Sequence, residues 1–225
     1  KSLIIASSYS GNTEEALSTY KEAKENNLSL VVVSTGGKLL EQAKQDGTPY
    51  IQLPDMGIQP RSALGLSIVA TFALIRDKKL LKEAKKLSKK FKPEDIEEEG
   101  KVISKNIFSR IPVIYSSSEN ESIAYNWKIT LNETAKIPAF YNVFPELNHN
   151  EMEGFDISDK TKELSEKFSF IFMKDITDDA RIDKRMKVLK KEYEDRGLPV
   201  MEVELKGKSA LEKVLNAIIL VDWIS

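Results

Sequence analysis

Short apolar runs alternate with amphipathic stretches in the first part of the chain. Residues 3–6, 28–33 and 50–53 have the length and composition of buried strands. Residues 13–26 and 38–45, which lie between these runs, carry apolar side chains at helical spacing. This β-α-β-α-β order predicts a parallel sheet with right-handed crossovers. Ligands of such sheets bind beyond the carboxyl ends of the strands.

The same alternation resumes in the second half. It predicts strands at 111–116, 138–144, 168–173 and 200–205, and helices at 121–136, 178–196 and 210–223. An apolar stretch at 64–75 predicts a further buried helix in the first half. Residues 77–105 are dense in Lys and Glu and predict a solvated, helical connector without chemistry of its own. The expected organisation is a first subdomain at 1–76, a connector at 77–105 and a second subdomain at 106–225.

Composition narrows the class of protein. The 225 residues include 34 basic and 35 acidic side chains, a balance that argues against nucleic-acid or membrane-surface binding driven by bulk charge. The absence of cysteine excludes disulfides and thiolate chemistry, and the single histidine excludes a multi-histidine metal site within one chain. No apolar run approaches the ~20 residues that span a bilayer. With no signal peptide visible, the expected location is the cytoplasm.

The turn after the first strand is rich in hydroxyl groups. Ser7, Ser8, Ser10 and Thr13 surround Gly11, and a helical pattern with acids in its first turn follows. A helix N-terminus has unpaired N–H groups that bind anions, and added hydroxyls make a cradle for a phosphate monoester. An ordinary Ser/Thr helix cap explains the local residues equally well.

The amino-acid sequence of this turn resembles a known motif. Residues 8–15 read S-Y-S-G-N-T-E-E, which matches the S-x-S-G-N-T-x-E phosphate-binding loop of sugar isomerase (SIS) domains. The resemblance implies a doubly wound α/β fold that binds phosphosugars, with two SIS-type subdomains in tandem. It also implies that Ser8, Ser10 and Thr13 hold the sugar phosphate.

Three further motifs resemble the bifunctional phosphoglucose/phosphomannose isomerase branch of these proteins. They are P-R-x-x-x-G at 60–65, N-E-x-A-K at 132–136 and P-E-x-x-H-N-E at 145–151. The resemblance implies that Arg61 lies in the active site, that Glu133 is the catalytic base and that His149 opens the sugar ring. On residue type alone, all three would be surface side chains. Glu146 and Glu151, in the third motif, are interpreted as structural.

The implied reaction is an aldose–ketose isomerisation through an enediol. A carboxylate removes a proton from one carbon and returns it to the next, while a fixed cation stabilises the enediolate. The expected substrates are glucose 6-phosphate and fructose 6-phosphate, with mannose 6-phosphate as a second aldose, and no metal or organic cofactor is required. The resemblance also implies a homodimer whose active sites combine residues of both subunits.

Two other functions fit the same fold. One is a non-catalytic phosphosugar sensor, which would need neither Glu133 nor His149. The other is an SIS isomerase for a different sugar phosphate. The family also has a G-G-S turn upstream and an active-site lysine on a later helix, and the sequence contains neither. The first subdomain is therefore expected to be incomplete at its start and the second at its end, and Lys213 is not a substitute for that lysine.

Overall fold

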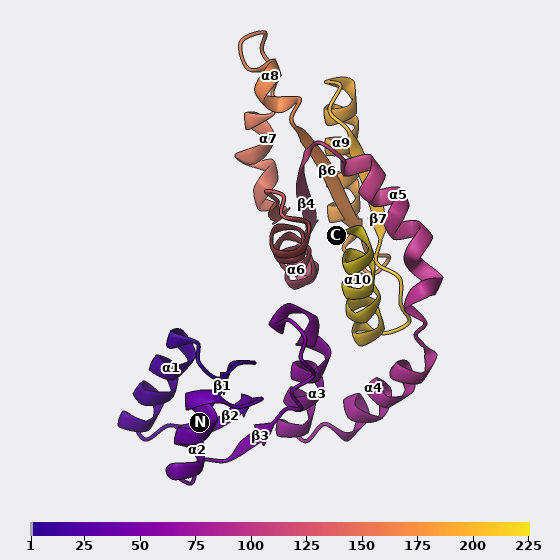
Figure 1. The fold of residues 1–225 in the computed structure, drawn as a ribbon. Coiled ribbons are helices and arrows are strands. Elements are labelled where there is room, and N and C mark those ends of the chain that lie inside the picture. The colour runs from indigo at the N-terminus through magenta and orange to yellow at the C-terminus, as the bar shows by residue number, and fades with distance from the viewer. Residues whose placement is uncertain (1) are drawn as a thin grey trace. The chain divides into compact units, whose positions relative to one another are not determined.

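The computed structural model describes residues 2–225. These residues form two compact units, of which the first ends at Lys90 and the second is Phe91–Ser225. Each unit has its own parallel sheet, and Figure 1 shows the elements of both. The strand order is β1-β2-β3 in the first unit and β5-β4-β6-β7 in the second. Within the described part of the chain, no helix is long and apolar enough to cross a membrane. The expected α/β class with parallel sheets is confirmed.

Over residues 2–90, the first unit contains three strands and four α-helices. They are β1 (Leu3–Ser7), α1 (Glu14–Glu25), β2 (Ser29–Ser34), α2 (Gly37–Gln45), β3 (Tyr50–Gln52), α3 (Leu64–Leu74) and α4 (Lys78–Lys90). Alternate strand residues face opposite sides of the sheet. Val32 packs in a cluster with residues of α1 and α2, whereas Val33 packs with Ala70 of α3. The sheet is therefore covered by helices on both faces, as a parallel sheet requires.

All three strands of this sheet run in the same direction. The turns that follow β1, β2 and β3 therefore meet at one edge of the sheet. These turns comprise residues 8–13, 34–37 and 53–61. This carboxyl edge is where the sequence predicts ligand binding.

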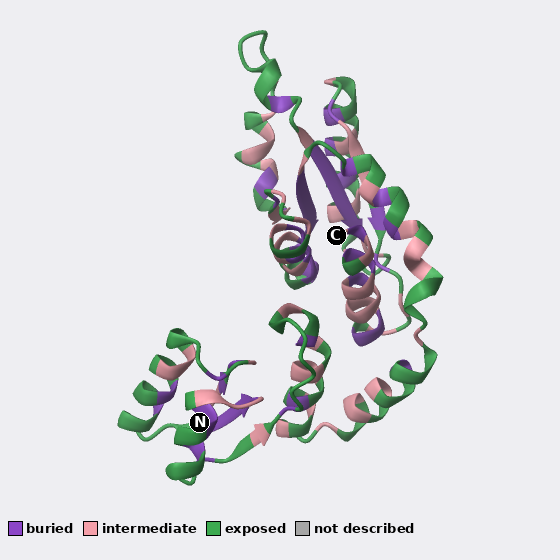
Figure 2. Cartoon of the chain, viewed as in Figure 1, coloured by how far each residue is buried: buried purple, intermediate pink, exposed green. Residues whose placement is uncertain are grey.

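The second unit continues the same architecture with a larger sheet. Its elements are α5 (Glu97–Ile107), β4 (Ile111–Ser117), α6 (Glu121–Thr130), β5 (Phe140–Phe144), α7 (Glu151–Gly154), α8 (Lys162–Ser165), β6 (Phe168–Lys174), α9 (Ala180–Asp195), β7 (Val200–Glu204) and α10 (Ala210–Ile224). Figure 2 shows that its central strands are buried. Ile114 and Ile171 face a cluster with α5, α6 and α10, while Tyr115 and Phe170 face a cluster with α9.

The strands and helices expected from periodicity are present with small shifts at their ends. Two segments carry more structure than the sequence pattern indicates. Residues 77–105 contain α4, which belongs to the first unit, and most of α5, which belongs to the second. Ile103 of α5 is buried in the core of the second unit, so this charged stretch has an apolar face. The helix expected at 121–136 ends in a π-helical turn, Leu131–Ala135.

Candidate functional site

The hydroxyl groups of the first turn form a linked cluster. The hydroxyls of Ser8 and Thr13 are 2.8 Å apart, and the Ser8 oxygen accepts from the backbone N–H of Gly11 at 3.1 Å. The Ser10 oxygen accepts from the N–H of Asn12 at 3.3 Å. Ser8 is buried, whereas Ser10 and Thr13 are exposed. The structure therefore brings the three predicted phosphate ligands into one turn at the start of α1.

The position of Thr13 bears on the helix-cap interpretation of this turn. Thr13 occupies the N-cap position of α1, but its side chain makes no capping hydrogen bond. It bonds to Ser8 instead. Because the first-turn N–H groups of α1 receive no side-chain cap from Thr13, they retain the capacity to bind an anion. This geometry favours the cradle over a simple cap.

A second turn, 34–37, supports the first. The backbone oxygen of Tyr9 accepts from the N–H and the hydroxyl of Thr35, at 3.0 and 2.6 Å. The backbone oxygen of Gly11 accepts from Leu39 N–H at 2.9 Å, and the side chain of Asn12 accepts from Lys38 N–H at 3.2 Å. On sequence alone, this Ser-Thr-Gly-Gly stretch cannot be distinguished from an ordinary turn. Its position directly after a buried strand is the feature of the sequence that could have indicated a place beside the first turn.

Glycine is required where the two turns touch. Gly11 has a φ of +71°, and a Cβ built on it would lie 1.8 Å from the carbonyl oxygen of Gly36. Gly37 has a φ of +68°, and its Cβ would lie 2.4 Å from the carbonyl oxygen of Ser10. Contacts this short are sterically impossible, so the two turns interlock only because both positions lack a side chain.

Arg61 lies on the segment that follows β3. It is half-buried in a 3₁₀ turn, Pro60–Ala63, which leads into α3. Tyr9, in the hydroxyl-rich turn, packs with residues of α3, and its phenolic oxygen accepts from Met56 N–H at 3.3 Å. One residue of the predicted phosphate loop therefore ties that loop to the segment carrying Arg61.

Glu133 lies at the centre of the π-helical turn that ends α6. The turn is anchored by Leu131, which is fully buried, and it ends at Lys136, which has a left-handed φ of +59°. The side-chain oxygen of Asn132 accepts from Ala139 N–H at 2.8 Å and so holds the turn against the start of β5. Glu133 itself is exposed. Single π-helical turns within helices are frequent at functional sites.

His149 lies beyond the carboxyl end of β5, whereas the turn of Glu133 contacts the start of that strand. It comes after a 3₁₀ turn, Glu146–Asn148, whose Leu147 is fully buried. The side chain of His149 is exposed. Asn132, next to Glu133, bonds to the residue that precedes β5, whereas His149 follows the end of β5. The backbones of Glu133 and His149 therefore lie at opposite ends of this strand. The five residues of β5 separate these ends by about 16 Å.

The serine-rich turn of the second unit is built differently from that of the first. The Ser117 hydroxyl donates to Asp178 at 2.6 Å, and the Ser118 hydroxyl donates to the backbone oxygen of Phe144 at 2.9 Å. Ser116 is fully buried and donates to the backbone oxygen of Ser117. These hydroxyls bond within the second unit, so this turn does not reproduce the hydroxyl cluster of the first unit.

Lys213 is part of a half-buried ion pair. Its ammonium group donates to Asp175 and to the hydroxyl of Thr177, and the side chains of Lys213 and Asp175 are only 12% and 5% exposed. Burial acts to raise the pKa of Asp175, but the hydrogen bonds from Lys213 and Thr177 outweigh it and hold that pKa below its usual value. The pair borders a crevice of about 590 Å³ beyond β4 and β6. The ion pair gives Lys213 a structural role in the second unit.

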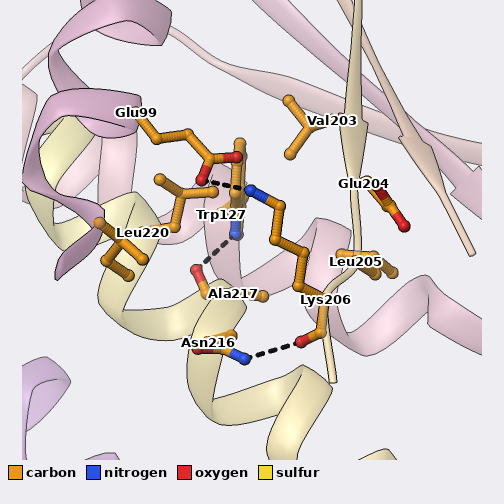
Figure 3. Close-up of a pocket in the computed structure, with 10 residues that line it drawn as sticks. Glu99, Trp127, Val203, Glu204, Leu205, Lys206, Asn216, Ala217 and Leu220 are labelled. Atoms are coloured by element: carbon orange, nitrogen blue, oxygen red, sulfur yellow. Dashed lines mark hydrogen bonds and ion pairs between the residues drawn. The ribbon is translucent and has the colours of Figure 1, made fainter. Parts of the chain in front are cut away.

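A small cavity lies between α5, β7 and α10 (Figure 3). It measures about 70 Å³ and is lined mainly by apolar side chains, including Trp127 and Leu220. Lys206 crosses it to pair with Glu99 at 2.7 Å, and the indole N–H of Trp127 donates to the backbone oxygen of Ala217 at 2.9 Å. The residues that the sequence assigns to the site do not line this cavity.

Comparison with known proteins decides the family. Residues 96–225 match the model of the bacterial phospho-glucose isomerase C-terminal SIS domain. The chain is 36% identical, over 99% of its length and 68% of the relative's, to the bifunctional phosphoglucose/phosphomannose isomerase of Aquifex aeolicus. The chain belongs to the bifunctional phosphoglucose/phosphomannose isomerase family. The resemblance drawn from its motifs is therefore confirmed.

Other comparisons agree with this family assignment. The family's member from Caldicellulosiruptor bescii is also 36% identical, over the whole chain and 69% of that relative. Among solved structures, the tagatose-6-phosphate ketose/aldose isomerase of Escherichia coli aligns with a TM-score of 0.66, covering 99% of this chain and 66% of that one. Its sequence identity is 13%, so this likeness concerns the fold alone.

Proposed function

We propose that this member of the bifunctional phosphoglucose/phosphomannose isomerase family interconverts glucose 6-phosphate and fructose 6-phosphate, and also accepts mannose 6-phosphate. The observation that carries the proposal is that a carboxylate and an imidazole, the two groups that the isomerase reaction needs, are both exposed. Glu133 stands exposed on a π-helical turn, and His149 stands exposed beyond β5. A phosphosugar sensor would need neither group. We further propose a cytoplasmic location, since charged sugar phosphates remain in the compartment where they form.

In the proposed mechanism each group has one task. The Ser8, Ser10 and Thr13 hydroxyls and the start of α1 hold the 6-phosphate. His149 assists opening of the hemiacetal ring, because an imidazole can exchange protons near neutral pH. Glu133 then takes the proton from C2 of the open-chain aldose and returns it to C1. Arg61 stabilises the negative charge on the enediolate oxygen.

The proposal includes a homodimer with shared active sites. Glu133 and His149 start from opposite edges of one sheet, about 16 Å apart by the length of β5. A single substrate is smaller than this separation. A site that needs both groups is most simply completed by the His149 of a second copy.

Conversion of substrate tests the function directly. The protein is incubated separately with glucose 6-phosphate and mannose 6-phosphate, and formation of fructose 6-phosphate is measured. Turnover of glucose 6-phosphate is expected, with turnover of mannose 6-phosphate as the second activity. Binding of these sugars without turnover would indicate the sensor instead, and turnover of another sugar phosphate alone would indicate a different isomerase.

A further inference from the structure

The carboxylate of Glu151 joins two strands of the second unit to the start of α7. One oxygen accepts a 2.6 Å hydrogen bond from the hydroxyl of Tyr115 in β4, and the other accepts from the amide Nδ2 of Asn142 in β5. The other end of that amide is also fixed, because its Oδ1 accepts from Val143 N–H at 2.8 Å. Glu151 itself is half-buried. Two donors from neighbouring strands therefore fix its position.

The hydroxyl of Tyr115 depends on this carboxylate. Tyr115 is fully buried, and burial, with added effects of Tyr193 and Glu151, raises its pKa. The phenol therefore stays protonated and acts as a donor. A buried donor left without an acceptor is unfavourable, so the contact between Tyr115 and Glu151 is strongly preferred.

His149 lies between two anchored residues. Leu147, two positions earlier, is fully buried in the apolar core. Glu151, two positions later, is held by the donors from β4 and β5. The backbone N–H of His149 donates to the carbonyl of Glu146 at 2.9 Å, while its side chain remains exposed. The backbone is thus fixed on both sides of an imidazole that is open to substrate.

We propose that Glu151 is a positioning residue, which holds the backbone of His149 where its imidazole can act. This inference rests on the proposed function, which gives His149 its role in ring opening. Glu151 acts only through His149, so it adds nothing once the imidazole is gone. Glu146 provides a matched control: it belongs to the same motif, is exposed, and has no hydrogen-bonding or ionic partner for its side chain among residues 2–225.

The single histidine makes the positioning measurable without an activity assay. Protein labelled with ¹⁵N-histidine gives one backbone amide signal, from His149. The heteronuclear NOE of this signal reports picosecond-to-nanosecond motion. Glu151→Ala should lower the NOE, and Glu146→Ala should leave it unchanged. An unchanged NOE in folded Glu151→Ala protein overturns the proposal.

Tyr115→Phe covers the case in which Glu151→Ala does not fold. It removes one donor to Glu151 and, with it, the Tyr115 hydroxyl that would otherwise lose its acceptor. A smaller drop in the His149 NOE is expected because Asn142 still holds the carboxylate. If Glu151→Ala is unfolded and Tyr115→Phe leaves the NOE unchanged, the positioning role is contradicted.

A double-mutant cycle separates positioning from general stability. Glu151→Gln should lower kcat for ring-form substrate by up to about 100-fold, the cost of a misplaced catalytic group, with KM little changed. In a His149→Ala background, the same substitution should cost nothing further. An equal loss in both backgrounds would show that Glu151 does not act through His149. Failure of the proposed function appears differently, as wild-type protein without isomerase activity, and the amide measurement still decides the inference.

Discussion

Thr13 shows how one side chain distinguishes two interpretations of a turn. It stands at the N-cap of α1 yet bonds to Ser8, not to the helix. The motif alone predicted the residues of the cradle. It could not predict the support from Thr35, which lies 26 positions from its partner Tyr9, because that contact depends on the pairing of β1 with β2. The contact of Glu151 with Tyr115, 36 positions apart, was hidden for the same reason.

Ser10 tests the phosphate cradle. Its exposed hydroxyl can donate to a phosphate oxygen, so Ser10→Ala should weaken binding of 6-phosphate sugars by about 1–3 kcal/mol. Calorimetry with glucose 6-phosphate and glucose measures the difference. Unphosphorylated glucose should be unaffected, as should Ser18→Ala, an exposed serine on α1. Equal weakening for both sugars would contradict the cradle.

Glu133 tests the proton transfer. Glu133→Gln keeps the shape of the side chain but removes the base, so turnover should fall at least ~100-fold while substrate affinity changes little. The measurement is exchange of solvent deuterium into C2 of the sugar. Exchange at the wild-type rate in Glu133→Gln would assign the base to another residue.

At the scale of elements, periodicity predicted most of the fold. The apolar runs became buried strands because both sheet faces are covered, and the amphipathic stretches became the covering helices. The π-helical turn around Glu133 could not be predicted in this way. It depends on the bond from Ala139 to Asn132 and on the buried Leu131, which are tertiary contacts.

The interlocked turns of the first unit predict a large cost at Gly11. Gly11 and Gly47 have similar positive φ values, +71° and +65°, but only Gly11 has neighbours within 4 Å of a built Cβ. Gly47→Ala should cost about 1 kcal/mol for the left-handed backbone. Gly11→Ala should cost roughly 1–3 kcal/mol more, because the turns must separate. Urea unfolding measures both, and equal losses would contradict the interlock.

The half-buried pair of Asp175 and Lys213 predicts a pH effect on the second unit. The pKa of Asp175 in the fold lies below its ordinary value of 3.8, so the unfolded chain binds this proton first as the pH falls. Stability from the pair is therefore complete well above pH 3.8 and is lost below it.

Asp175→Asn tests that effect. It should cost about 1.5–3 kcal/mol near neutral pH, because Lys213 loses a charge-assisted hydrogen bond to its half-buried counter-ion. The loss of stability in acid should also become smaller, because residue 175 then no longer titrates. Unfolding by urea at several pH values provides the measurement. Asp195→Asn, in an exposed pair with Lys191, serves as the control and should cost under about 1 kcal/mol. Equal effects of the two variants would show that burial of the Asp175 pair is unimportant.

At the scale of the whole molecule, the placement of the two motifs around β5 supports the proposed homodimer. The N-E-x-A-K motif lies before β5 and the P-E-x-x-H-N-E motif lies after it, at opposite edges of the sheet. The apolar run at 138–144 predicts the strand between Glu133 and His149, but it could not show that Asn132 fixes the turn of Glu133 to the start of that strand. The family resemblance supplied the idea of a shared site, and the topology gives it a physical reason.

Complementation between inactive variants tests this account most directly. Glu133→Gln and His149→Ala proteins are each expected to be nearly inactive on ring-form glucose 6-phosphate. When their subunits exchange, one of the two sites in each mixed dimer regains both wild-type residues, so random mixing should restore about a quarter of wild-type activity. Exchange is verified independently with differently tagged subunits. If exchange occurs and no activity returns, Glu133 and His149 do not meet across two chains, and the shared-site account is wrong.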